Sequence, residues 1–226
     1  MTRSKQLPYP RAILFDLDGT LADTAPDLAA AANKLRTARG LAPAPYAKLR
    51  PFASAGARGL IGAAFGLKPG DEEYESLRIG FLENYESALV VDSRLFDGVT
   101  TMLETIRELG LLWGIVTNKA SRFTDPLVPL IGLQRAGCVI SGDTTAHSKP
   151  HPAPLLEAAR RIGVAPGDCW YVGDDLRDIQ AGQAAGMPTV AAAWGYCGDA
   201  GPASWNADAV ASAPLELLEM ISKSRT

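Results

Sequence analysis

Short apolar runs alternate with amphipathic stretches along most of the chain. Apolar runs with the length of a buried strand occur at 12–15, 111–117, 137–141, 169–173 and 188–193. Between them, apolar residues recur at helical spacing, which predicts helices at 99–109, 120–131, 153–162 and 175–185. Strands that are apolar on both faces and alternate with helices form parallel sheets. We therefore expect an α/β protein with a doubly wound parallel sheet, to which the C-terminal tail adds a short edge strand and a closing helix.

The segment 21–94 departs from this alternation. Its first helix carries a possible N-cap, a proline in its first turn and a terminal glycine, which are Asp23 or Thr24, Pro26 and Gly40. Further helices are expected at 45–51, 53–65 and 71–91, and no strand is expected in this segment. The pattern predicts two domains: an α/β core made of residues 1–20 and 95–226, and an inserted all-helical domain made of residues 21–94.

Composition narrows the class of protein. The chain has 226 residues, 47% of them apolar, and a net charge of -3 without a basic tract, so we expect no nucleic acid and no membrane as partner. Three cysteines without a CxxC pair are typical of a reducing compartment. The N-terminus lacks an apolar stretch of signal-peptide length, and no apolar run is long enough for a membrane helix. We expect a cytoplasmic protein, either a monomer or a homodimer.

Polar side chains follow three of the predicted strands. Asp16 and Asp18 come after the first, Thr117 and Asn118 after the second, and Asp174 after the strand 169–173. The carboxyl ends of parallel strands meet at one edge of the sheet, where α/β proteins bind ligands. A lysine, Lys149, precedes a predicted helix in the loop "AHSKPHP". We expect these groups to form one site.

The residue types at this site indicate phosphate chemistry. Close carboxylates repel one another unless a cation lies between them, and a set of oxygen ligands without histidine or cysteine selects a hard ion such as Mg²⁺. Thr117, the amide of Asn118 and the ammonium of Lys149 are donors suited to phosphate oxygens. One carboxylate can be a nucleophile, and a second can transfer protons. Asp16 and Asp18 are two residues apart on an extended chain, so both face one reaction centre.

Four segments resemble a known family. The sequences "ILFDLDGTLADT", "IVTN", "SKPHP" and "YVGDDLRD" resemble the four motifs of the haloacid dehalogenase superfamily, in the order that this family uses. The resemblance implies a flavodoxin-like core with a mobile helical cap of the first cap class. It also implies that Asp16 is the nucleophile and Asp18 the general acid/base, and that Thr117 and Lys149 hold the phosphoryl group. Asp174 would bind Mg²⁺ together with Asp16 and the backbone carbonyl of Asp18.

The acid at position 18 indicates the reaction. Dehalogenases of this superfamily lack it because a halide leaves without a proton, whereas an alkoxide needs one. We therefore expect a phosphomonoesterase that acts on a small phosphorylated metabolite through an aspartyl phosphate. A sugar-phosphate mutase shares the same residues. A non-enzymatic receiver module also has an acidic Mg²⁺ pocket, but receivers are much shorter and have no inserted cap.

Two subfamilies come closest in overall appearance. The chain resembles bacterial phosphoglycolate phosphatases and also N-acetylmuramic acid 6-phosphate phosphatases of cell-wall recycling. A two-carbon acid would need a cation in the cap, for which Arg58 in "SAGARGL" is our candidate, and we expect 2-phosphoglycolate as the substrate. Arg122 and Arg177 are further candidates, and an amino-sugar phosphate would need a roomier cap.

Two acids near the fourth motif have an open role. Asp175 and Asp178 either hold the waters of the metal ion or are acids favoured by a helix N-terminus.

Overall fold

The core of the protein is a parallel sheet, seen in a computed structural model that describes residues 7–198 and 201–225. Six strands lie in the order β5-β4-β1-β6-β7-β8, and all neighbouring pairs are parallel. The strands are β1 (Ala12–Phe15), β4 (Leu112–Val116), β5 (Val139–Ile140), β6 (Cys169–Gly173), β7 (Thr189–Ala192) and β8 (Ala209–Ala211). The chain builds one side of β1 with β4 and β5 and then crosses to the other side with β6. This arrangement confirms the expected α/β fold with a doubly wound sheet.

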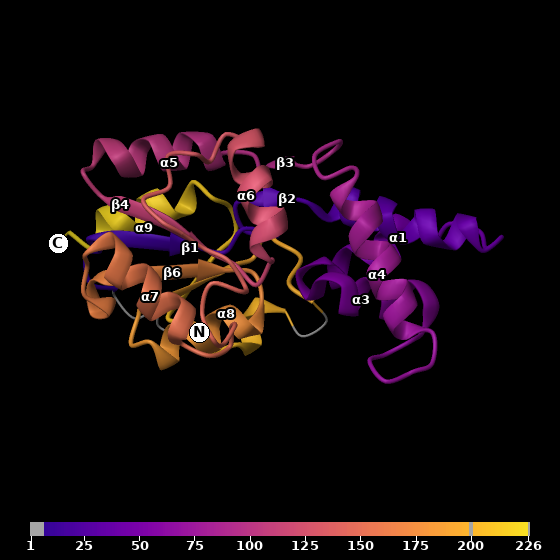
Figure 1. Cartoon of the computed structure of the whole chain (residues 1–226). Coiled ribbons are helices and arrows are strands. Elements are labelled where there is room, and N and C mark those ends of the chain that lie inside the picture. Colours follow the sequence, from indigo (N-terminus) through magenta and orange to yellow (C-terminus); the bar gives the residue numbers. More distant parts are fainter. Residues whose placement is uncertain (1–6, 199–200, 226) are drawn as a thin grey trace.

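Helices cover both faces of the sheet (Figure 1). One face carries α5 (Val99–Glu108), α6 (Ser121–Leu130) and α9 (Glu216–Lys223), and the other carries α7 (Ala153–Ile162) and α8 (Leu176–Ala184). Strand β1 is buried on both sides. Ile13 and Phe15 pack on the face that carries α5, α6 and α9, and Ala12 and Leu14 pack on the face that carries α7 and α8. This alternation is the period of two that a strand imposes, and it explains why β1 is an uninterrupted apolar run.

The helical insertion lies beside the core, at the right of Figure 1. It consists of α1 (Ala25–Ala38), α2 (Tyr46–Leu49), the 3₁₀ helix η1 (Arg50–Ala55), α3 (Gly56–Phe65) and α4 (Tyr74–Glu86). These helices share a hydrophobic cluster of their own, which also contains Phe123 and Tyr196 from the core. The insertion therefore has its own packed interior, to which two aromatic side chains of the core also belong.

Some boundaries differ from the sequence prediction. The helix expected at 45–51 ends at Leu49 and continues as η1, because Pro51 has no N–H to donate within an α-helix. The helix expected at 71–91 spans only Tyr74–Glu86. Two further short 3₁₀ helices, η2 (Pro166–Asp168) and η3 (Pro202–Ser204), were not expected. The ends of the expected core, 1–6 and 226, lie outside the described residues, as do 199–200 within it.

The prediction that 21–94 contains no strand is wrong. Strand β2 (Ala22–Asp23) pairs antiparallel with β3 (Arg94–Leu95), so the chain enters and leaves the insertion through a two-stranded ribbon. A strand of two residues is too short to show an alternating pattern, and its pairing depends on a partner far along the chain. The ribbon therefore holds together the two points at which the chain passes between the core and the insertion.

The start of α1 is capped from a distant part of the chain. Thr24 is the N-cap residue, but its side chain makes no capping hydrogen bond. Instead, the backbone N–H groups of Thr24 and Ala25 donate to the hydroxyl of Tyr196 at 2.8 and 2.9 Å. The Tyr196 hydroxyl in turn donates to Asp23 Oδ1 at 3.0 Å. The expected N-cap position is thus confirmed at Thr24, but the hydrogen bonds that cap the helix are accepted by Tyr196.

Candidate active site

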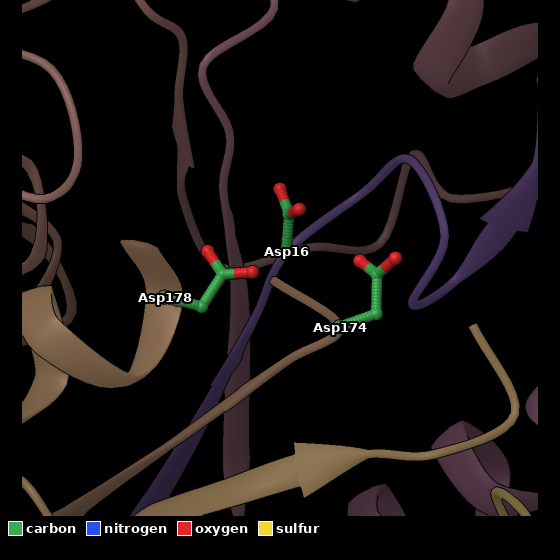
Figure 2. A group of neighbouring side chains, drawn as sticks. All are labelled: Asp16, Asp174 and Asp178. Atoms are coloured by element: carbon green, nitrogen blue, oxygen red, sulfur yellow. The ribbon is translucent and has the colours of Figure 1, made fainter. Parts of the chain in front are cut away.

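Three buried carboxylates meet at the carboxyl edge of the sheet (Figure 2). Asp16 directly follows β1, Asp174 directly follows the neighbouring strand β6, and Asp178 lies in the first turn of α8. A carboxylate oxygen of each lies within 4.8 Å of the others. The backbone N–H of Asp16 still donates to the carbonyl of Val172 at 2.9 Å, so sheet pairing fixes the position of Asp16.

Lys149 supplies positive charge beside two of these acids. Its Nζ lies 2.9 Å from Asp16 Oδ1 and 2.7 Å from Asp178 Oδ1, and it donates to the hydroxyl of Tyr171 at 2.8 Å. Asn118 holds the backbone of Lys149 from both sides, because its Nδ2 donates to the Lys149 carbonyl and its Oδ1 accepts from the Lys149 N–H, each at 2.9 Å. The side-chain amide of Asn118 thus positions Lys149. The sequence had instead suggested that this amide donates directly to phosphate.

Burial and mutual repulsion shift the acids toward protonation. Burial raises the pKa of Asp16 from 3.8 to about 7, and the charges of Asp178 and Asp18 add to this, while Lys149 opposes it. Burial, together with Asp16 and Asp178, raises the pKa of Asp174 well above its ordinary value. Burial acts to lower the pKa of Lys149, but Asp16 and Asp178 raise it on balance. One ammonium therefore does not neutralise three carboxylates.

Hydrogen bonds from three segments of the chain orient Asp174. Its Oδ1 accepts from the hydroxyl of Thr20 at 3.1 Å, and its Oδ2 accepts from the N–H of Tyr196 at 2.9 Å and from the hydroxyl of Ser54 at 3.1 Å. Gly19 lies so close that a Cβ there would be 2.1 Å from Asp174 Oδ2, and its φ of +89° also favours glycine. Because Ser54 belongs to η1, the helical insertion touches the acidic site directly.

The three acids fit a bound divalent cation. Asp16 Oδ1 is buried and ion-paired with Lys149, yet it receives no well-aligned hydrogen bond from any residue that the structure describes. Buried charged oxygens are normally saturated by donors or by a metal ion. An all-oxygen set with excess negative charge suits a hard cation.

Asp18 faces a different set of neighbours. Its Oδ1 accepts from the hydroxyl of Thr24 at 2.5 Å and from Lys119 Nζ at 2.8 Å. Lys119 is buried, and its Nζ lies 4.7 Å from the ring centroid of Tyr85, a residue of α4 in the insertion. Sequence reasoning missed Lys119, although it directly follows the pair Thr117 and Asn118 that it had selected.

Two acids of the fourth motif have roles at the start of α8. The side chain of Asp175 accepts from the Arg177 N–H, and that of Asp178 accepts from the Asp175 N–H, which together make a capping box. Arg177 also binds both carboxylate oxygens of Asp175 and donates to the Ser54 carbonyl at 2.9 Å. Of the two roles left open by the sequence, the geometry favours helix N-terminal acids, and Asp178 additionally pairs with Lys149.

A cleft of about 630 Å³ lies between the core and the insertion. Its floor carries the expected site residues Asp16, Asp18, Thr117, Asn118, Lys149, Asp175 and Asp178. Its wall on the insertion side combines the apolar residues Leu28, Ile79, Phe81, Leu82 and Tyr85 with the polar residues Ser54, Arg78 and Glu83. Arg122 and Arg177 also line the cleft, whereas Arg58 is exposed and is not among its lining residues. The contact of Arg58 with a substrate therefore stays a prediction.

The fold and the site define a class of hydrolase, in which a cap inserted after the first strand covers acids at the carboxyl edge of a parallel sheet. The chain belongs to the haloacid dehalogenase-like hydrolases, whose family description matches residues 13–192. This confirms the resemblance carried by the four motifs. The helical insertion is the cap of this fold, and we use that word for it below.

Similar proteins are phosphatases by name. The chain is 49% identical to a phosphoglycolate phosphatase of Xanthomonas campestris pv. campestris over 93% of this chain and 96% of that protein. It is 41% identical to an N-acetylmuramic acid 6-phosphate phosphatase of Pseudomonas aeruginosa over 94% and 95% of the two chains. The crystal structure of a predicted phosphoglycolate phosphatase from Haemophilus somnus superimposes with a TM-score of 0.83 at 27% identity, covering 94% of this chain and 98% of that one. Among the described residues, no helix combines the length and the apolar character that crossing a membrane requires.

Proposed function

We propose that this protein is a phosphomonoesterase that hydrolyses a small phosphorylated metabolite through an aspartyl phosphate on Asp16. The observation that carries the proposal is the convergence of Asp16, Asp18, Thr117 and Lys149 on the floor of one cleft. The similarity to two kinds of phosphatase over nearly the whole chain supports the same reaction.

Each group has a defined task in this reaction. Asp16 attacks phosphorus, and the bond from phosphorus to the leaving oxygen breaks. Asp18 gives that oxygen a proton, and later takes a proton from the water that releases phosphate from Asp16. Lys149 and Thr117 stabilise the negative phosphoryl oxygens during both transfers.

Magnesium fits the acids as the required cation. Asp16, Asp174 and the backbone carbonyl of Asp18 would hold Mg²⁺, with Asp178 remaining paired to Lys149. The ion would supply charge neutralisation, which allows a phosphate dianion to enter a site that already contains three carboxylates.

The substrate we propose first is 2-phosphoglycolate, since relatives of 47–49% identity carry that name. A second candidate, N-acetylmuramic acid 6-phosphate, is favoured by the size of the cleft. A cavity of about 630 Å³ falls in the range that encloses drug-sized ligands, and the apolar residues of its wall suit a body larger than a two-carbon acid. Arg78, Arg122 and Arg177 line the cleft and are candidates to bind a carboxylate of either substrate.

The proposal is tested by phosphate release from both substrates, with Mg²⁺ and with EDTA. We expect Mg²⁺-dependent release from at least one of them, and we expect Asp16→Asn to abolish it while circular dichroism remains unchanged. The matched control is Asp125→Asn, which changes an exposed acid of α6 and should retain full activity. Retained activity in Asp16→Asn would refute the nucleophile, and formation of a bisphosphate instead of free phosphate would indicate a mutase.

A further inference from the structure

The two oxygens of the Asp18 carboxylate have different surroundings. The side-chain hydrogen bonds that Asp18 receives within the described chain all reach Oδ1, from Thr24 at 2.5 Å and from Lys119 at 2.8 Å. An oxygen that accepts from a hydroxyl and an ammonium serves as the carbonyl oxygen when the carboxyl group is protonated, because a proton placed there would displace one of these donors. The proton that Asp18 transfers therefore belongs on Oδ2.

Lys119 joins this carboxylate to the cap. Its side chain is 7% exposed and lies between Asp18 of the core and the Tyr85 ring of α4. The Tyr85 hydroxyl is buried and finds no hydrogen-bond partner in the part of the chain that the structure describes. The ammonium of Lys119 lies over the ring face of Tyr85, and a ring face attracts a cation.

We propose that Lys119, held by the ring of Tyr85, is a positioning residue that fixes Asp18 Oδ1 and so directs the protonated Oδ2 at the leaving oxygen of the substrate. The proposal rests on the phosphatase function proposed above. During the first step Asp16 forms a bond to phosphorus, the ester bond breaks, and the proton on Oδ2 moves to the departing oxygen. Because Tyr85 is a cap residue, the general acid is aligned only while α4 covers it.

Three substrates separate this role from its alternatives. The leaving groups of ethyl phosphate and 2-phosphoglycolate are both basic alkoxides that need a proton. Of these two substrates, 2-phosphoglycolate alone carries a carboxylate. The p-nitrophenyl group of p-nitrophenyl phosphate leaves as a weakly basic anion and gains little from an acid. We compare kcat/KM, which reports formation of the aspartyl phosphate and excludes the later hydrolysis that all three substrates share.

The decisive variant is Lys119→Met, with Lys34→Met on the exposed side of α1 as the matched control. We expect Lys119→Met to lower kcat/KM for both alkyl phosphates by about 10- to 100-fold, a part of what general acid catalysis contributes, and to leave p-nitrophenyl phosphate within about threefold. Retained hydrolysis of the aryl ester also shows that the variant is folded. Tyr85→Leu should reproduce the alkyl-selective loss, whereas Tyr85→Phe keeps the ring and should resemble the wild type.

Other outcomes overturn the assignment. An equal loss on all three substrates would give Lys119 a structural role only. A loss confined to 2-phosphoglycolate would make Lys119 a carboxylate-binding residue. If the wild-type protein hydrolyses none of the three esters and neither candidate metabolite, the phosphatase function is refuted, and the role of Lys119 with it. This outcome differs from the first two, in which the wild type is active.

Discussion

Asp16 is a carboxylate whose surroundings favour its neutral form until a cation arrives. It is 7% exposed, lies beside Asp174 and Asp178, and is ion-paired with Lys149. A nucleophile must be ionised, so the same burial that excludes water also opposes the reactive state. We infer that cation binding sets the protonation of Asp16 as well as the charge of the substrate pocket.

This imbalance predicts how stability depends on pH. In EDTA, the folded protein keeps a proton on Asp16 up to pH about 7, whereas an unfolded chain releases it near 3.8. The stabilisation from this group is therefore fully present below about pH 4 and is lost as the pH rises through about 7. Relative to Asp16→Asn, which does not titrate, the wild type should lose on the order of a few kcal/mol of unfolding free energy across this window. Urea unfolding of both proteins between pH 4 and pH 8 measures the difference, and parallel curves would contradict the prediction.

Among the individual residues, the sequence identified those site residues whose type is unusual for their position. Asp16 and Asp174 stand out because charges follow buried strands, and Lys149 stands out within a recognisable motif. Lys119 did not stand out, since a lysine after a strand is ordinarily a solvated residue, and only the fold brings Asp18 and Tyr85 to it. Arg58 does not line the cleft in this structure, since a run of small residues indicates a close approach of backbones but does not say which side of the helix faces the cleft.

Among the elements, α1 depends on a side chain 171 residues away in sequence from its first residue. Sequence reasoning placed this helix correctly from Pro26 and Gly40, because propensity and breakers are local signals. It could not identify the group that accepts the capping hydrogen bonds, since the donors of Thr24 and Ala25 are satisfied by Tyr196 through tertiary structure. The strands β2 and β3 escaped prediction for the same reason, as each exists only through its partner.

The capping contact predicts the effect of Tyr196→Phe. This change removes the acceptor of two helix N–H groups and leaves the ring and the backbone contact to Asp174 in place. We expect a loss of about 1–2 kcal/mol in unfolding free energy, as for other N-cap deletions. Faster hydrogen exchange should be seen at the amides of Thr24 and Ala25. The control is Tyr9→Phe, because the Tyr9 hydroxyl accepts an exposed hydrogen bond from Arg225; an equal effect of both changes would contradict the capping role.

For the whole molecule, cation binding should be visible as stability. The proposed Mg²⁺ site joins acids that are apart in the unfolded chain, so the ion would stabilise the folded state by about 2.7 kcal/mol at a hundred times its dissociation constant. We expect the thermal midpoint of the wild type to rise with Mg²⁺ concentration. Asp174→Asn should abolish this rise, whereas Asp125→Asn should keep it; an unchanged midpoint in the wild type would refute the site.

The two-residue ribbon of β2 and β3 has a consequence for how this enzyme can be altered. Ala22 pairs with Leu95, so the chain departs from the core and returns to it at neighbouring points, about 5 Å apart as in any antiparallel pair. The whole cap therefore replaces a single loop of the core, and its length and content do not affect the order of the strands in the sheet. A different folded module with adjacent ends could be grafted there, and the catalytic floor would keep its chemistry while acquiring a new selectivity. The ribbon of β2 and β3 is thus the place at which the cap can be exchanged to make chimaeric enzymes.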